Sequence, residues 1–111
     1  MNILQITSSV RGNDSESTRV TNLVVDKLVA ANPGATVVRH DFGARPHPLL
    51  DGAAVGALFT PADKRTPEQA ARVALDDALI LEAQAADVIV IGAPMYNFGM
   101  PVQLKNWFDA I

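Results

Sequence analysis

The fold is decided by the stretch ADVIVIGAPMYNFGMPVQLKNWFDAI, residues 86–111. Its first part, Asp87–Gly92, holds the uninterrupted apolar run 88–91, so both of its faces are suited to burial. Such a run is typical of a central strand in a parallel sheet that carries helices on both sides. A loop at 93–100 follows, and Pro101 is well placed to open a helix. The spacing predicts that one face of this helix holds Leu104, Phe108 and Ile111.

The first part of the chain predicts a similar unit. Residues 2–7, NILQIT, form a short apolar segment, which indicates a buried strand. A polar loop, 8–18, leads into a helix at about 16–31 that ends at the helix-breaking NPG of 32–34. Residues 35–42, ATVVRHDF, mix apolar and charged side chains as an exposed edge strand does. Spacings of three and four predict that the helix packs on the sheet through Val20, Leu23, Val24, Leu28 and Ala31.

A long connection, 43–65, is rich in proline and glycine. It is too long for a simple turn, so it predicts a lid with one turn of helix near Ala53–Leu58. A second long helix is predicted to begin at Thr66–Gln69 and to run to about Ala85. Its start combines a capping threonine, a proline at the first helical position and a glutamine placed for a reciprocal capping box.

The predicted order is strand, helix, strand, long loop, helix, strand, helix. This order indicates an α/β protein with a doubly wound parallel sheet and right-handed crossovers. If the polar strand is the edge and the strand at 87–92 is central, the first strand lies between them and the sheet order is 2-1-3. In such sheets, ligands bind outside the carboxyl ends of the strands where the chain reverses its winding. The loops Ser8–Thr18 and Ala93–Met100 flank that point.

Composition limits the classes of function. The chain has 111 residues, 49% of them hydrophobic and 19% charged, which predicts one globular domain. A formal charge of -3 without a cluster of lysine and arginine argues against nucleic acid or an anionic membrane as a partner. The absence of cysteine excludes disulfides, thiol catalysis and cysteine-ligated metal sites. No apolar stretch approaches the roughly 20 residues of a membrane span, and we expect a cytoplasmic protein.

The loop 8–18 carries the hydroxyl side chains of a candidate phosphate site. Ser9, Ser15 and Ser17 lie before or at the start of a helix, whose N-terminal N–H groups and dipole attract anions. The alternative is an ordinary hydrophilic turn in which Ser15 or Ser17 caps the helix, and the loop alone does not decide between the two. Neither G-x-x-x-x-G-K-[ST] nor G-x-G-x-x-G follows the first strand, so nucleoside triphosphatase and dinucleotide-binding interpretations lose support.

The loop 93–100 offers a surface for a flat ring. Met95, Tyr96 and Phe98 supply apolar side chains, and Asn97 supplies an amide that both donates and accepts hydrogen bonds. This set matches a planar heteroaromatic ring with carbonyl and ring-nitrogen edges. The alternative is that the aromatic side chains only cover the end of the sheet. An aromatic cluster opposite a hydroxyl-rich loop favours the ligand.

The segment VIVIGAPMYNFGMPVQLKNWFD resembles the FMN-dependent NADH:quinone oxidoreductases, also called FMN-dependent azoreductases, of the flavodoxin-like fold. SES at 15–17 and LLDG at 49–52 fit the same family. The resemblance implies FMN as the cofactor, bound through two sets of residues. The phosphate and ribityl end would contact Ser9, Ser15, Glu16 and Ser17. The isoalloxazine would contact Met95, Tyr96, Asn97 and Phe98.

The resemblance also implies the reaction. NADH or NADPH would give a hydride to the flavin, and the flavin would then reduce a quinone or an azo compound by two electrons in a ping-pong sequence. The cofactor carries this chemistry, so no residue is assigned as a catalytic acid or base. A homodimer with its pockets near the dimer interface is implied as well. Two alternatives stay open: a flavodoxin-type electron carrier and a non-catalytic half-domain.

Residues 1–111 correspond to the N-terminal part of a single domain of this family, whose complete sheet has the order 2-1-3-4-5. The chain is expected to be truncated after its third strand and the start of the next helix. We therefore expect weak or absent FMN binding and activity from this chain alone. We also expect an open edge on the strand at 87–92 and poor coverage of Trp107 and Phe108.

The remaining polar candidates predict surface positions. His40 and His47 lack the spacing and acidic neighbours of a metal site, and we expect both to be exposed to solvent. Asp76 and Asp77 lie in the middle of a predicted helix, on what we expect to be its solvated face. No metal site is predicted.

Overall fold

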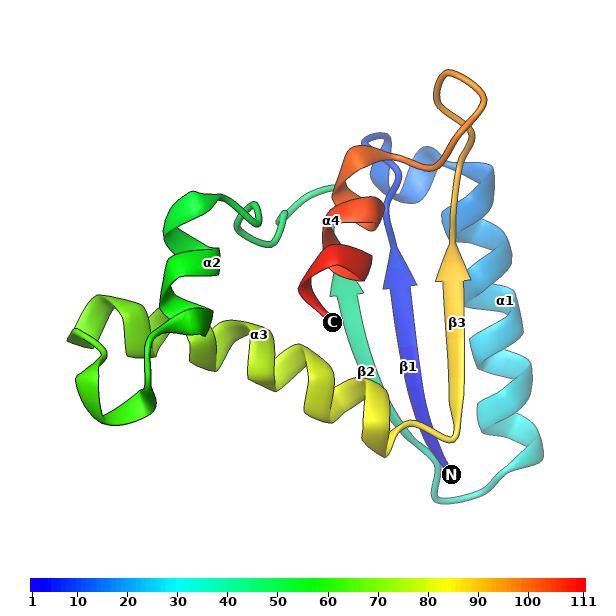
Figure 1. The fold of residues 1–111 in the computed structure, drawn as a ribbon. Coiled ribbons are helices and arrows are strands. Elements are labelled where there is room, and N and C mark those ends of the chain that lie inside the picture. The colour runs from blue at the N-terminus through cyan, green and yellow to red at the C-terminus, as the bar shows by residue number, and fades with distance from the viewer.

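The computed structural model describes all residues, 1–111, and contains one parallel sheet of three strands (Figure 1). The strands are β1 (Asn2–Thr7), β2 (Thr36–Asp41) and β3 (Val88–Gly92). Their order is β2-β1-β3. The predicted α/β class and the predicted order 2-1-3 are therefore confirmed.

The chain has four α-helices, three of which pack on the sheet. Helix α1 (Glu16–Ala31) packs on one face, and α3 (Pro67–Ala85) and α4 (Val102–Ala110) lie on the other. Figure 1 shows that α2 (Gly52–Phe59) and the first turns of α3 extend away from the sheet. Short 3₁₀ turns occupy Gly12–Asp14 and Ala62–Lys64. None of the helices is both long and apolar enough to cross a bilayer.

Strand β1 is central because it pairs along both of its edges. Ile3 aligns with Val37 of β2 on one side and with Val88 of β3 on the other. The side chains of β1 are buried from Ile3 to Thr7, whereas those of β2 are half-buried or exposed and none is fully buried. The prediction that the mixed sequence of β2 forms an edge strand is confirmed, and β3 pairs with β1 alone.

The hydrophobic core lies between the sheet and the helices α3 and α4. It consists of Leu4, Ile6, Phe42, Leu79, Leu104 and Trp107. Trp107 is only 2% exposed, so the expectation that it is poorly covered is wrong. Phe108 and Ile111, which were predicted to share the face of Leu104, are exposed, so the expected poor coverage of Phe108 is confirmed. Residues three apart and residues four apart both lie on one helix face, so the sequence pattern fits two rotations of α4. The observed rotation buries the indole of Trp107, which removes more apolar area from water than the smaller Phe108 ring would.

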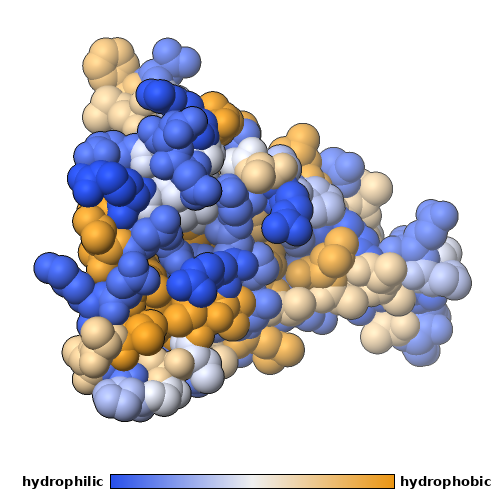
Figure 2. All heavy atoms as spheres, turned by 180° about the vertical axis from the view of Figure 1, so that it is seen from behind, coloured by the Kyte–Doolittle hydropathy of each residue, from blue (hydrophilic) through white to orange (hydrophobic).

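The buried face of α1 also differs from the prediction. Val20, Leu23 and Val24 are exposed, while Val25 is fully buried. The sheet face opposite α1 is not uniformly apolar, because the buried Gln5 points to this side between Ile3 and Thr7. Its amide donates to Asn22 Oδ1 at 2.7 Å and accepts from Arg39 Nε at 2.9 Å. Figure 2, seen from behind, shows apolar surface in orange among hydrophilic residues on this side of the molecule. Alongside Val25, α1 buries two small hydroxyl residues, Thr18 and Thr21.

Two of the predicted surface residues are buried and contact each other instead. His47 Nε2 lies 2.7 Å from Asp76 Oδ1, and the two side chains are 7% and 3% exposed. Arg72 Nη1 contacts the same carboxylate oxygen at 2.6 Å. The predictions of a solvated Asp76 and an exposed His47 are therefore wrong. A buried carboxylate is stable only when such partners neutralise it and satisfy its hydrogen bonds, and those partners come from a distant loop and from the preceding helical turn.

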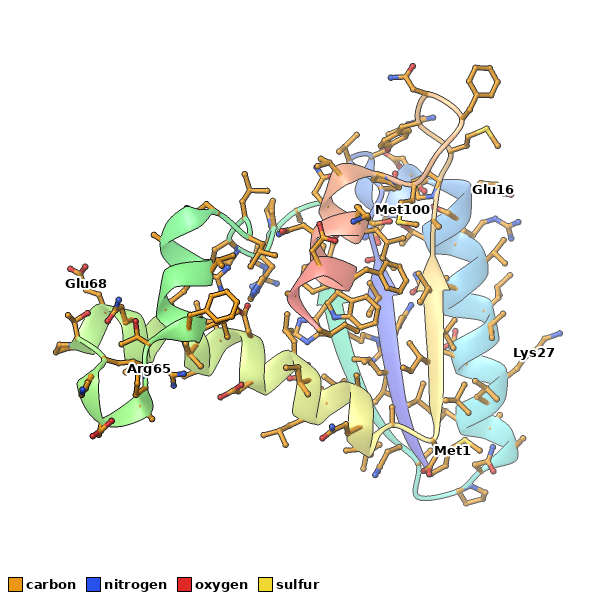
Figure 3. The ribbon with its side chains drawn as sticks, in the orientation of Figure 1. Met1, Glu16, Lys27, Arg65, Glu68 and Met100 are labelled. Carbon is orange, nitrogen blue, oxygen red and sulfur yellow. The ribbon has the colours of Figure 1, made fainter.

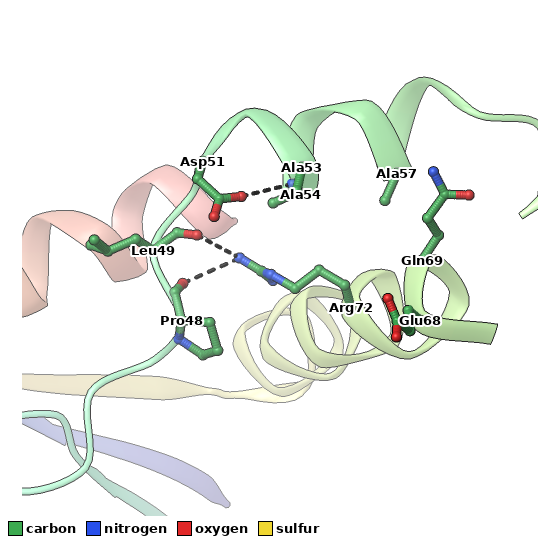
Figure 4. Close-up of a pocket in the computed structure, with 9 residues that line it drawn as sticks. All are labelled: Pro48, Leu49, Asp51, Ala53, Ala54, Ala57, Glu68, Gln69 and Arg72. Atoms are coloured by element: carbon green, nitrogen blue, oxygen red, sulfur yellow. Dashed lines mark hydrogen bonds between the residues drawn. The ribbon is translucent and has the colours of Figure 1, made fainter. Parts of the chain in front are cut away.

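The segment after β2 is fastened to α3 and α4 through its backbone. Arg72 donates to the carbonyls of Pro48 and Leu49, each at 3.2 Å, as Figure 4 shows. Asn106 of α4 donates to the carbonyls of His47 and Pro48, at 2.9 and 3.2 Å. Residues of this segment, α2 and α3 line a cavity of about 350 Å³. These bonds anchor the part of the predicted lid next to α4.

His40 is half-buried rather than fully exposed. Its Nε2 lies 2.5 Å from Glu82 Oε2 on α3. The imidazole also stacks on Phe42, with ring centroids 5.1 Å apart and planes 2° from parallel. The predicted exposure of His40 is therefore wrong in part, because its position at the edge of the core gives it a carboxylate and an aromatic neighbour.

We predict that Asp76→Asn destabilises the chain by roughly 3 kcal/mol, because Arg72 and the buried His47 lose their shared carboxylate. Urea unfolding followed by circular dichroism measures the change. The matched control is Asp77→Asn, which alters an exposed neighbour on the same helix and is expected to change stability by less than about 0.5 kcal/mol. Equal midpoints for the two variants would contradict the buried role of Asp76.

Candidate functional site

The candidate site lies where β1 and β3 end side by side. Thr7 aligns with Gly92 in the parallel register, and the next residue, Ser8, is fully buried. Its hydroxyl donates to the Gly92 carbonyl at 2.7 Å. The loops that follow the two strands therefore start next to each other, as the predicted position of the switch point required.

Close backbone packing holds the first of these loops. The backbone N–H of Phe42 donates to the Thr7 carbonyl at 2.9 Å, which brings the chain after β2 against Ser9. A Cβ atom at Gly43 would lie only 2.0 Å from the Ser9 carbonyl oxygen. Only glycine fits at this point, because the atom that it approaches belongs to the backbone and has little freedom to move away.

The N-terminus of α1, where Figure 3 labels Glu16, presents hydrogen-bond donors at the end of this loop. Ser15 is the N-cap residue, and its hydroxyl oxygen accepts from the N–H of Thr18 at 3.4 Å. The hydroxyls of Ser15 and Ser17 lie 2.8 Å apart. The N–H groups of Glu16 and Ser17 have no acceptor within the chain, as expected in the first turn of a helix. These N–H groups and the helix dipole favour an anion here.

The side chain of Glu16 does not oppose an anion as strongly as its charge indicates. Its carboxylate forms a bidentate pair with Arg19, at 2.6 and 2.8 Å. The hydrogen bonds and the charge of Arg19 lower the pKa of Glu16 below its ordinary value. Glu16 therefore contributes its backbone N–H to the site, while its charge is compensated by a neighbour on the same helix.

Tyr96 joins the second loop to the first. Its hydroxyl oxygen accepts from the backbone N–H of Val10 at 3.1 Å and lies 3.4 Å from Ser9 Oγ. Ser9 Oγ in turn accepts from the N–H of Arg11 at 3.1 Å. The hydrogen bond with Ser9, followed by that from Val10, lowers the pKa of Tyr96 below its ordinary value, and the charge of Arg11 acts in the same direction.

Residues 96–99 form a tight hairpin turn. Tyr96 and Gly99 exchange two backbone hydrogen bonds, at 2.9 and 3.1 Å. Asn97 and Phe98 both have positive φ angles, 51° and 64°, as in a two-residue turn of type I′. Asparagine tolerates this region, but a phenylalanine there is strained. The Phe98 side chain is 96% exposed, so no packing within the chain compensates for the strain.

The two loops together enclose a cavity of about 280 Å³. It is lined by Ser9, Arg11, Ser15, Glu16, Ser17, Pro94 and Tyr96. Five of the eight predicted site residues are therefore in one cavity. Of the other three, Met95 directly precedes the hairpin, and Asn97 and Phe98 form its exposed turn. Arg11 was not among the predicted site residues, although its positive charge within the serine-rich loop was a usable signal.

A parallel α/β sheet in the order 2-1-3, with a donor-rich loop after its first strand, defines the class of flavodoxin-like proteins. Comparison with known families agrees. Residues 1–111 match the family described as having a flavodoxin-like fold, and the chain belongs to this family.

Two named relatives are similar to this chain over its whole length. The FMN-dependent NADH:quinone oxidoreductase of Aromatoleum aromaticum is 69% identical over 111 residues, which cover 100% of this chain and 56% of the relative. The protein of the same name from Dechloromonas aromatica is 60% identical with the same coverage. The chain thus spans about half the length of these relatives.

Among solved structures, an FMN-dependent NADH-azoreductase from Bacillus anthracis str. Ames Ancestor in complex with FMN matches with a TM-score of 0.88. The match covers 100% of this chain and 55% of the azoreductase, at 19% sequence identity. An azoreductase from Bacillus anthracis str. Sterne matches with a TM-score of 0.83 at 22% identity, over 99% of this chain and 54% of that one. At these identities the structural matches establish the fold.

We predict that Gly43→Ala destabilises the chain by about 1–3 kcal/mol, because the new methyl group collides with the Ser9 carbonyl. Thermal unfolding measures the loss. Gly56→Ala is the control: this glycine lies within α2 with no other atom near its Cβ position, so alanine is expected to stabilise by up to about 1 kcal/mol. A Gly43→Ala variant as stable as the parent chain would contradict the close approach.

Tyr96 is the single tyrosine of the chain, so its phenolate absorbance can be titrated directly. We expect a lower pKa in the folded chain than in the urea-denatured chain, with Ser9→Ala moving the folded value back up. Because the folded pKa is depressed, ionised Tyr96 stabilises the fold. That stability is fully present above the unfolded value of about 10 and is lost as pH falls through the folded pKa. A folded pKa at or above the denatured value would refute the contact.

Proposed function

We propose that the chain binds FMN and forms part of an FMN-dependent oxidoreductase that uses NADH or NADPH to reduce quinones and azo compounds. One observation carries the proposal: the cavity in which the donors at the α1 N-terminus meet Tyr96 at the carboxyl ends of β1 and β3. The names of the relatives that are 60–69% identical to the chain support the choice of cofactor and reaction.

The donors in the cavity fit a phosphate monoester. Ser15 and Ser17 have two hydroxyl hydrogens between them, and Thr18 N–H already donates to Ser15. One hydroxyl hydrogen links the two oxygens, so the other is free for a ligand. The free N–H groups of Glu16 and Ser17 add two donors from the helix start. A phosphate presents several acceptor oxygens and a negative charge, which this set and Arg11 complement.

The exposed hairpin fits the flat part of the same ligand. Met95 and Phe98 offer apolar surface that nothing in the chain covers, and Asn97 offers both amide donors and an acceptor. The strained φ of Phe98 is a feature that recurs at ligand-binding sites. We therefore assign these three residues to the isoalloxazine, which would lie next to the cavity that holds the phosphate.

The cofactor supplies the two-electron hydride chemistry when it is bound. The residues of this chain bind its phosphate, place its ring against the hairpin and shield part of it from water. No acid or base of the chain is required, and none of the three residues assigned to the ring, Met95, Asn97 and Phe98, is titratable. The proposal therefore predicts that substitutions in the two loops act mainly through cofactor affinity.

The proposal extends to organisation and location. Residues 1–111 would form the N-terminal part of a single flavodoxin-like domain, in agreement with the 56% coverage of the relatives. The assembly would be a homodimer with pockets near the dimer interface, and the protein would be cytoplasmic. Size-exclusion chromatography with light scattering would test the dimer.

We predict that the chain binds FMN more tightly than riboflavin, and that Ser17→Ala removes most of the difference. The variant lacks a hydroxyl of the anion site, so FMN affinity should fall by about tenfold while riboflavin affinity stays within twofold. Quenching of flavin fluorescence measures both. Thr36→Ala is the control, because it removes a hydroxyl at the opposite end of the sheet.

Equal affinities for FMN and riboflavin would contradict the phosphate site. With FMN bound, oxidation of NADH in the presence of a quinone tests the reaction itself. Turnover would support the oxidoreductase, whereas bound FMN that is not reduced by NADH would favour an electron carrier. A chain that binds neither FMN nor riboflavin would favour the non-catalytic half-domain.

A further inference from the structure

We propose that Tyr96 is a phosphate-end contact: together with Ser9, its hydroxyl donates a hydrogen bond to the phosphate group of the nucleotide. This assigns Tyr96 to the opposite end of the ligand from the ring position that the family resemblance implies. The inference rests on the proposed function, because it requires a phosphorylated ligand in the cavity. It is carried by the hydrogen-bond count at Ser9 and Tyr96 and by the residues that surround them.

The hydrogen-bond count leaves one donor without a partner. Ser9 Oγ accepts from the N–H of Arg11, and the Tyr96 oxygen accepts from the N–H of Val10. The only other partner of each hydroxyl within the chain is the other, at 3.4 Å. Two hydroxyl hydrogens are present, and one is used between the two oxygens. Whichever hydroxyl donates, the other hydrogen has no acceptor in the chain.

The position of the pair directs this hydrogen to the phosphate. Both residues line the cavity that also contains Ser15, Ser17 and Arg11. The Ser15–Ser17 pair is similar in one respect: its two hydroxyls share one hydrogen bond, a backbone N–H donates to Ser15 alone, and one hydroxyl hydrogen is left over. Two hydroxyl pairs therefore offer one free donor each to the same space. An anion with several acceptor oxygens is the ligand that satisfies both.

The ionisation of Tyr96 is consistent with Ser9 as the donor within the pair. The hydrogen bond from Ser9 is the main reason that the pKa of Tyr96 is lowered, and the N–H of Val10 adds to it. A phenol oxygen that accepts two hydrogen bonds is a stronger donor through its own hydrogen. In this arrangement, Tyr96 supplies the free hydrogen.

The hairpin connects the Tyr96 contact to the residues that are assigned to the ring. Two backbone hydrogen bonds between Tyr96 and Gly99 fix Asn97 and Phe98 relative to the tyrosine. A phosphate that binds the Tyr96 hydroxyl therefore also fixes the residues assigned to the ring. Tyr96 contacts one end of the ligand and positions the side chains that contact the other end.

The first test compares FMN with riboflavin in the Tyr96→Phe variant, which keeps the ring and removes the hydroxyl. We expect FMN affinity to fall by roughly tenfold to a hundredfold, the range for a hydrogen bond to a charged group. Riboflavin affinity should stay within twofold. Phe98→Leu is the matched control at the ring end, and it should weaken both flavins by a similar factor. Fluorescence quenching measures all four affinities.

The second test follows the absorbance of the single tyrosine with inorganic phosphate, which does not absorb in the same region. A bound phosphate that accepts from the Tyr96 hydroxyl holds its proton, so the pKa of Tyr96 should rise as phosphate is added. Sodium chloride at equal ionic strength is the control for screening. The rise should be abolished by Ser17→Ala, which removes another donor of the cavity and leaves Tyr96 intact.

The outcomes separate this inference about Tyr96 from the proposed phosphate site and the proposed function. Loss of the preference for FMN in both Ser17→Ala and Tyr96→Phe supports the inference. Loss in Ser17→Ala alone overturns the inference but leaves the phosphate site standing. Equal weakening of both flavins by Tyr96→Phe also overturns it, because Tyr96 then acts on the ring. Tighter FMN binding by Tyr96→Phe would mean that the phenol only blocks the site. No preference in the parent chain overturns the inference and the proposed function together.

Discussion

Parallel pairing along both edges of β1 is the constraint on which the rest of the structure depends. The register aligns Thr7 with Asp41 on one side and with Gly92 on the other, so the three strands end at one level. The buried hydroxyl of Ser8 then links the ends of β1 and β3 through the Gly92 carbonyl. Because every strand points the same way, the loops that follow them meet at one edge of the sheet.

The two faces of the sheet differ in polarity, and different helices cover them. The face under α3 and α4 is apolar and carries the core around Trp107. The face under α1 contains the buried Gln5, which is satisfied by Asn22 and Arg39. Helix α1 packs on this face with Val25 and the small hydroxyl residues Thr18 and Thr21, and the free N–H groups of its first turn point to the candidate site.

The candidate site combines a rigid base with a strained rim. The close approach of Gly43 to the Ser9 carbonyl leaves the first loop little room to move. The rim is the hairpin in which Asn97 and Phe98 hold positive φ angles. The backbone bonds between Tyr96 and Gly99 and the contact of the Tyr96 hydroxyl with Val10 hold the hairpin in this conformation. Strain that is held by such contacts keeps the exposed residues in one arrangement before a ligand binds.

The sequence by itself determined the elements, because their signals are local. Helix α1 spans Glu16–Ala31 as predicted, and the reciprocal cap at Thr66 starts α3. It also determined which loops hold the candidate site, because the carboxyl ends of parallel strands lie at the same edge of a sheet. Tertiary structure alone decided which helix faces are buried and which polar groups meet. His47 and Asp76 are 29 positions apart, and the contact between the first loop and Tyr96 spans 87. Local periodicity does not encode such distant partners, since several rotations and pairings satisfy the same pattern until the chain packs.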